Sequence, residues 1–339
     1  MTASAPPRRA LWRRMEGLPI IGVFVVVIAL FIAIAPDVFL GYRIYMSFLA
    51  TAAPVLVIAL GLTLVLAAAE IDLSFPAVVA FSGFLFGAMF TSWEMTWLAL
   101  IVALAGGALV GFINGLLIAV IGIPSIIATL ATMFFWGGIT TVLSGGLSYS
   151  LRTVDDFAIW SVFVGRIGAV PVQALWALGL TVVVWFLLNR HRFGEHLLFI
   201  GENIGVARVV GIDVTRERLK LFTLMGVLAA FAAVLLTLEN KNFFNTQGQG
   251  YLLTVIAAVF IGGSSIFGGQ ATVVGSLVGA FIITMIEAGL VAAGIQGFWV
   301  RAVVGLVFLV AVIFHLLMDN PAKRRELGRL AGLARGGPG

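Results

Sequence analysis

The chain has 339 residues, of which 61% are hydrophobic and 10% charged, and it carries a net charge of +5 and no cysteine. Soluble globular domains carry about 25% charged residues, so this composition excludes a soluble protein and indicates an all-α polytopic membrane protein. The absence of cysteine excludes disulfides and thiolate sites. The basic residues lie beside apolar segments, where they set membrane topology, so we expect no nucleic-acid partner.

Ten apolar segments fill most of the chain, and each is close to the length that crosses a bilayer as a helix. The first, residues 18–36, follows four arginines, as the apolar core of a signal peptide would. It is longer than such a core and ends at Pro36, a poor cleavage position, so we expect a retained span. The other segments cover residues 46–68, 75–91, 96–120, 124–144, 171–188, 221–238, 251–268, 271–291 and 298–318. We expect one transmembrane domain over residues 1–339.

Charge predicts the orientation of these ten spans. Of the 20 lysines and arginines, four lie in the tail 1–17, six in the polar central loop 189–220 and five in the tail 319–339. A ten-span chain places all three regions on one side, which the positive-inside rule identifies as the cytoplasm. Because five is an odd number of crossings, ten spans divide into two five-helix halves of opposite orientation, and we expect this arrangement here, as in inverted-repeat transporters.

The stretch from Glu70 to Pro76 brings polar residues between apolar runs of the first half. Carboxylates near hydrocarbon are costly unless they meet water, a helix N-terminus or a cation. Asp72 and Ser74 either cap the helix that begins near Pro76 or line a polar route through the membrane. Glu70 lies either at the membrane interface or on that route.

Two further residues of the first half have alternative interpretations. Asn114 either bonds to a neighbouring helix or contacts a solute. Trp136 either packs against other side chains or stacks on a solute. Beside Asn114, the glycines at 107, 111 and 115 repeat at intervals of four and predict close helix contact, within the bundle or between subunits.

A second interruption, from Gly262 to Gly269, lies in the other half. Such interruptions expose backbone groups, so we expect them to be buried in protein or to line a wet path. Residues 263–268 have the glycine spacing of a phosphate-binding loop, but Gly269 and Gln270 follow where Lys and Ser or Thr are required, so the chain does not hydrolyse ATP. Glu287, in the ninth segment, is a candidate for the route or a hydrogen-bond partner of another helix. We expect no catalytic residue, metal site or cofactor in this chain.

A series of short motifs runs through the chain in one continuous order. They are Gly61-Leu62-Thr63, Ile71-Asp72-Leu73-Ser74, Asn114-Gly115, Ile127-Ala128-Thr129-Leu130, Ser144-Gly145-Gly146, Gly201-Glu202-Asn203, Ala207-Arg208, Gly211-Ile212-Asp213-Val214, Gly250-Tyr251, Ile256-Ala257-Ala258-Val259, Ile261-Gly262-Gly263-Ser264-Ser265 and Gly268-Gly269. Together they resemble the membrane subunit of bacterial ABC importers for sugars, the ribose/xylose/galactose-type permeases.

The resemblance implies a permease subunit of an ATP-driven importer for a sugar or another hydroxylated small solute, in the bacterial cytoplasmic (inner) membrane. It implies a second permease copy, identical or related, two ATP-binding subunits that hold ATP and Mg²⁺, and an extracytoplasmic solute-binding protein. Alternating access would open a path between the two copies. The residues we expect on the substrate path are Glu70, Asp72, Ser74, Asn114, Trp136 and Glu287.

The central loop is predicted to couple the permease to the ATPase. The stretch from Glu202 to Lys220 has the mixed charge of a helix lying along the membrane face, which could enter a cleft on the ATPase and transmit its closure. The residues we expect there are Glu202, Asn203, Arg208, Gly211, Asp213, Arg216 and Arg218. The alternative is a solvated loop that only sets topology.

The chain departs from the family pattern near the presumed route. The departures are at Glu70, Phe75-Pro76, Gly137, Leu252, Thr254 and Glu287, so a sugar other than ribose, or a polyol, is compatible. An ion-coupled secondary carrier using Glu70, Asp72 or Glu287 is the alternative within transport. A membrane enzyme such as a lipid-modifying transferase would need a cluster of catalytic polar residues that the sequence lacks.

Overall fold

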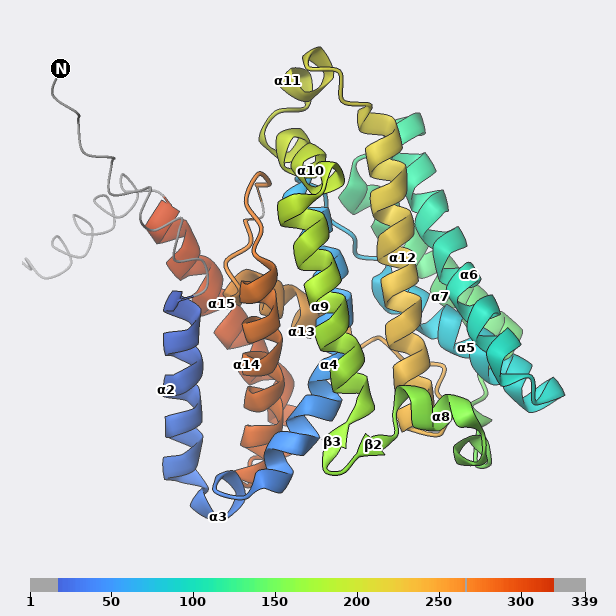
Figure 1. Ribbon diagram of the computed structural model, residues 1–339, viewed down its shortest axis with the longest axis vertical. Helices are drawn as coiled ribbons and strands as arrows, with labels where there is room; N and C mark the ends of the chain where they lie inside the picture. The colour runs from blue at the N-terminus through green and yellow to red at the C-terminus, as the bar shows by residue number, and fades with distance from the viewer. Residues whose placement is uncertain (1–17, 266, 320–339) are drawn as a thin grey trace, which may run out of the picture.

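A computed structural model describes residues 18–265 and 267–319, which form a helical bundle (Figure 1). In this part of the chain, seven helices are long and apolar enough to cross a membrane. They are α4 (Tyr42–Ala67), α5 (Phe75–Trp93), α6 (Thr96–Leu116) continued by the π-helix η1 (Leu117–Ile121), α7 (Ser125–Ser144), α9 (Val172–Arg190), α12 (Val214–Glu239) and α14 (Val273–Ala292). Three more apolar helices are α2 (Leu18–Ile34), α13 (Tyr251–Ile261) and α15 (Val300–Asp319). The tails 1–17 and 320–339, predicted to be cytoplasmic, lie outside the described residues.

Short elements gather at the two ends of the bundle (Figure 1). One end carries α10 (Arg192–Glu202) and α11 (Ile204–Val209). The opposite end carries α3 (Pro36–Phe39), α8 (Ala158–Phe163) and the antiparallel pair β2 (Arg166–Ile167) and β3 (Val170–Pro171). The remaining elements are β1 (Tyr149–Ser150), paired antiparallel with β4 (Asn242–Phe243), and the 3₁₀ turns η2 (Val154–Asp156) and η3 (Gly297–Trp299).

The centre of the bundle is α4. It packs against α9, α12, α13 and α14. In its most apolar stretch of 18 residues, 89% of the residues are buried, against 22% in the corresponding stretch of α7. The most buried helix of the first half therefore contacts mainly helices of the second. The polar residues of the loop that follows α4 are consequently buried in protein.

Helices α6 and α12 approach each other through glycine. A Cβ added at Gly111 would lie 2.1 Å from the Phe222 carbonyl oxygen, and one at Gly226 would lie 2.1 Å from the Gly107 oxygen. Neither position tolerates a side chain, so the two backbones are in direct contact. The predicted close helix contact of the α6 glycines is confirmed, and it joins two helices of the same chain.

The eighth apolar segment is shorter than predicted. Its helix, α13, ends at Ile261 instead of continuing to residue 268, because Gly263 adopts a φ of +86° that a right-handed helix excludes. The N–H of Ser264 instead donates to the Val259 carbonyl, closing the helix end. The described residues between α13 and α14, 262–265 and 267–272, are not helical, and we refer to them as loop 262–272.

The central loop also differs from the prediction. The single helix expected from Glu202 to Lys220 is three pieces, because Asn203 and Asp213 act as N-caps. Asn203 Oδ1 accepts from the Val206 N–H, and Asp213 Oδ1 from the Arg216 N–H, both at 3.1 Å. Arg216 and Arg218 consequently belong to the first turns of the membrane helix α12.

Candidate functional site

The loop between α4 and α5, residues 68–74, contains a buried polar network. Asp72 Oδ1 accepts from the Ser74 N–H at 2.7 Å and from the Ser74 hydroxyl at 2.6 Å. Asn114 donates to Ser74 Oγ and accepts from the Thr132 hydroxyl, both at 2.7 Å. Because Asp72, Ser74 and Asn114 are at most 2% exposed, this geometry fits a role in positioning the start of α5. The structure thus brings three of the predicted path residues together.

Hydroxyls of α7 satisfy the backbone of the same loop. The Ile71 N–H donates to Ser125 Oγ at 3.1 Å, and the Leu73 N–H donates to Thr129 Oγ1 at 3.0 Å. An interrupted backbone at membrane depth needs such partners. Sequence reasoning did not assign these hydroxyls a role, although Ser125, Thr129 and Thr132 repeat at the spacing of one helix face.

The loop between α13 and α14 is partly buried: Ser264 is fully buried, whereas Phe267 and Gln270 are exposed. Ser264 Oγ accepts from the Thr272 N–H at 3.2 Å, and Thr272 caps α14 by accepting from the Gly275 N–H at 3.0 Å. One turn into α14, the Ser276 hydroxyl lies 2.7 Å from Thr63 Oγ1 of α4. Both interruptions therefore end against α4 and its neighbours.

Glu70 and Arg218 form an ion pair that joins the two predicted sets of site residues. Glu70 is 5% exposed, and its carboxylate contacts the guanidinium of Arg218. The Arg218 side chain is 16% exposed. A residue expected on the substrate path and one expected in ATPase coupling thus contact each other directly, connecting loop 68–74 to α12.

A second contact, which we call the inner junction, joins α10, the end of α4 and loop 262–272. The Gly269 N–H donates to the Ala67 carbonyl at 3.1 Å. A Cβ added at Gly201 of α10 would lie 2.0 Å from the same Ala67 oxygen and 2.6 Å from the Gly269 nitrogen. A Cβ added at Gly268 would lie 2.5 Å from the Ala69 Cβ. Helix α10 therefore packs, with no side chain between, against the ends of both interrupted segments.

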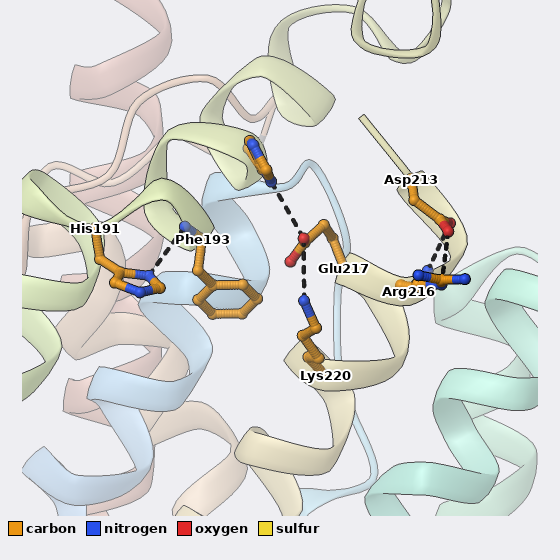
Figure 2. A network of polar contacts seen from close by, with 7 residues as sticks. His191, Phe193, Asp213, Arg216, Glu217 and Lys220 are labelled. Atoms are coloured by element: carbon orange, nitrogen blue, oxygen red, sulfur yellow. Dashed lines mark hydrogen bonds and ion pairs between the residues drawn. The ribbon is translucent and has the colours of Figure 1, made fainter. Parts of the chain in front are cut away.

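Charged groups connect α10 to α12 (Figure 2). Glu217 of α12 is buried; its Oε1 lies 3.1 Å from Nδ1 of His196 on α10 and accepts from Lys220 at 3.2 Å. Asp213 and Arg216 form a separate ion pair at 2.9 Å, with side chains 50% and 79% exposed. The first group attaches α10 to the bundle, whereas the second faces water.

The opposite face of α10 and α11 is exposed and partly apolar. Among its exposed side chains are Phe199, Val206, Val209 and Val210, and Val209 is 88% exposed. The predicted coupling residues Glu202, Asn203, Arg208 and Gly211 are also exposed, and Gly211 supplies a turn with a φ of +88°. These valines lie on the segment that projects beyond the helix ends (Figure 1), so lipid is a poor explanation for their exposure. Sequence reasoning concentrated on the charged residues and missed them.

The remaining path candidates lie apart from the polar network. Trp136 packs against Phe81, with ring centroids 4.8 Å apart, so the packing interpretation fits its surroundings. Glu287 lines a cavity between α4, α13, α14 and α15, where its Oε1 accepts from the Thr254 hydroxyl at 2.8 Å. The structure therefore does not gather all six path candidates at one place.

At the end of the bundle away from α10, an ion pair connects two loops. Lys241 Nζ lies 2.5 Å from Asp155 Oδ2, and its hydrogen bond holds the pKa of that carboxyl below its usual range. The Leu151 N–H donates to the Lys241 carbonyl beside the β1–β4 pair. The segment between α7 and α9 is thus attached to the segment that follows α12.

Comparison with known proteins extends over most of this fold. A family described as the permease component of the branched-chain amino acid transport system matches residues 44–312. The chain belongs to this permease family. The ribose import permease protein RbsC of Bacillus subtilis (strain 168) is 36% identical over 296 residues, covering 87% of the permease and 91% of that protein.

Other relatives have similar coverage but different printed solutes. The ribose import permease protein RbsC of Escherichia coli (strain K12) is 31% identical, over 78% of this permease and 81% of its own length. The autoinducer 2 import system permease protein LsrC of Klebsiella pneumoniae is 33% identical, over 89% and 88%. Branched-chain amino acids, ribose and autoinducer 2 all occur in these descriptions, so membership does not identify the solute.

The resemblance to sugar ABC importer permeases is confirmed. The permease is a multi-pass subunit of the bacterial cytoplasmic membrane and not an enzyme, and a partner ATPase hydrolyses ATP. Among the described residues, no group of three or more His, Cys, Asp or Glu is placed to hold a metal ion.

Proposed function

We propose that the permease forms the translocation path of an ATP-driven importer for a sugar or another hydroxylated small solute. The observation that carries this proposal is its similarity, over nearly full length, to permeases named for import of ribose and autoinducer 2. Two permease copies would enclose the path, two ATP-binding subunits would drive alternating access, and an extracytoplasmic binding protein would deliver the solute.

Ten crossings would account for the arrangement of the helices. The seven long apolar helices and the three shorter ones, α2, α13 and α15, would alternate in direction along the chain. This topology puts α10 and α11 in the cytoplasm, the β-pairs and α8 outside, and the two five-helix halves in opposite orientations. Figure 1 supports it, because α10 and α11 lie at one end of the bundle and α8, β2 and β3 lie at the other.

The two-sided α10–α11 segment supports ATPase coupling there. One face packs at the inner junction through Gly201 and contacts α12 through His196, and the other exposes Val206 and Val209. A partner that bound the valines and displaced α10 would displace the ends of α4 and loop 262–272 with it, because their backbones touch. Tight packing makes such displacement discrete rather than gradual.

Reconstitution tests the proposal. We expect proteoliposomes that contain the permease, its ATPase and its binding protein to take up a neutral sugar or polyol only when ATP is supplied. Omission of any one component should abolish uptake. Uptake by the permease alone, driven by a proton or sodium gradient, would contradict the proposal and favour the secondary-carrier alternative.

A further inference from the structure

The cavity that contains Glu287 has the size and lining of a small-molecule site. It is partly open and has a volume of about 890 Å³, within the range of ligand pockets. Its walls are mainly apolar side chains of four helices. Its polar groups are Thr51, Gln249, Tyr251, Thr254, Thr284, Glu287 and Arg301. We call it the outer cavity, because in the proposed topology it lies in the half of the membrane away from α10.

Three threonines of the outer cavity present oxygen acceptors and no free proton. The hydroxyl of Thr51 donates to the Ser47 carbonyl, that of Thr254 to Glu287 and that of Thr284 to the Ala280 carbonyl, each at 2.8 Å. A hydroxyl has one proton, so each of these oxygens can only accept a further hydrogen bond. Among the described residues, no hydrogen bond reaches the second oxygen of Glu287. A ligand that fits these groups must donate several hydrogen bonds.

Arg301 supplies the complementary charge. It lines the same cavity, is exposed, and has no carboxylate within ion-pair distance among the described residues. One carboxylate and one guanidinium cancel in net charge. A charged ligand would leave one of the two uncompensated, whereas a neutral ligand can donate to Glu287 and accept from Arg301.

We propose that the outer cavity binds a neutral polyhydroxylated solute, a sugar or polyol, with Glu287 and the three threonines accepting its hydroxyl protons and Arg301 donating to its oxygens. The apolar walls would contact the C–H faces of the solute. The inference rests on the proposed function, and it adds a site within one permease copy where that function requires only a path.

Cysteine labelling tests this site without relying on transport. The chain has no cysteine, so Val291→Cys, on the cavity wall, introduces a single thiol. Leu147→Cys is the control, because it is also an exposed aliphatic position but lies outside the cavity. The labelling rate with a water-soluble maleimide is measured on the complete importer, with the neutral solute that shows the fastest ATP-driven uptake among ribose, xylose, galactose and ribitol. Gluconate and glucosamine serve as anionic and cationic counterparts.

We expect the neutral solute to slow labelling of Val291→Cys several-fold and to leave Leu147→Cys unchanged, while the charged solutes protect neither. Adding Glu287→Gln should raise the protecting concentration about tenfold, because a hydrogen bond to a charged group is lost. Glu94→Gln, an exposed carboxylate outside the cavity, should leave it unchanged.

The outcomes separate the two proposals. If ATP-driven uptake occurs but no neutral solute protects Val291→Cys, or a charged solute protects it equally well, the outer cavity is not this site. Protection unchanged by Glu287→Gln would also overturn the assignment. If labelling is slow without any solute and becomes fast only when lipid is replaced by detergent, an acyl chain occupies the cavity instead. Absence of ATP-driven uptake in the unmodified importer would contradict the proposed function itself.

Discussion

The Glu70–Arg218 ion pair allows a quantitative test of how loop 68–74 is held to α12. Glu70→Gln leaves the Arg218 guanidinium without its counter-charge, although the Arg218 side chain is only 16% exposed. Removing one partner of a buried pair costs about 3–5 kcal/mol. Because Arg218 retains some contact with solvent, we expect the lower end, about 3 kcal/mol, as a loss in the free energy of unfolding.

The double variant distinguishes an ion pair from two independent contributions. Replacing both partners with apolar residues of similar size is often neutral, because neither charge is left buried. We therefore expect Glu70→Leu with Arg218→Met to lose far less stability than the sum of the two single changes. The matched control is Arg216→Gln, whose ion pair with Asp213 is exposed and should contribute less than about 1 kcal/mol.

Unfolding in mixed micelles, followed by tryptophan fluorescence, measures these differences. A Glu70→Gln variant as stable as Arg216→Gln would refute the reasoning. So would a double variant whose loss equals the sum of the single losses, since the two groups would then not interact.

Three further predictions concern the ends of the bundle. Gly201→Ala should separate α10 from Ala67 and lower ATP-driven uptake, since overpacking of this kind costs about 1–3 kcal/mol. Gly205→Ala is the control in the same uptake assay, because its added Cβ would meet only the Asn203 side chain, at 3.1 Å. Val209→Asp should reduce co-purification of the ATPase without changing the unfolding free energy, because the side chain is 88% exposed; unchanged co-purification would place the ATPase elsewhere. The hydrogen bond from Lys241 lowers the pKa of Asp155, so this ion pair stabilises the fold above about pH 4, and the stabilisation is lost as the pH falls through the lowered pKa. The difference in unfolding free energy between the unmodified protein and Asp155→Asn should therefore shrink on acidification. A difference that grew would contradict this reasoning.

Apolar length and glycine spacing were sufficient to predict most of the helices. The segment 75–91 corresponds to α5, and 124–144 to α7, because their boundaries are marked by Pro76 and by Pro124. The start of α12 was predicted seven residues late, at 221 instead of 214, since a helix capped by Asp213 continues through charged residues once it has left the bilayer. Apolar content therefore indicates the length of the membrane-embedded segment and not the full length of the helix.

The site was less predictable because its contacts depend on tertiary packing. Glu70 and Arg218 are distant in sequence, and no residue near either one indicates that the two form an ion pair. Asp72 and Asn114 each allowed a structural role and a solute contact, and only the structure shows that Ser74 and Thr132 occupy their hydrogen-bonding groups. The outer cavity was signalled by Glu287 and by the departures at Leu252 and Thr254, which also line it. Thr51 and Thr284 gave no signal, because they are ordinary residues in a membrane helix.

The direct backbone contact between α6 and α12 limits how the permease can move. Gly107 and Gly111 come from the segments before the central loop, and Gly226 comes from those after it. With no side chains between them to change rotamer, the two helices have no intermediate separation at which they still pack. One copy of the permease would therefore move as a rigid body around α6 and α12. Relative motion during the transport cycle would then occur at its peripheral helices and at its interface with the second copy.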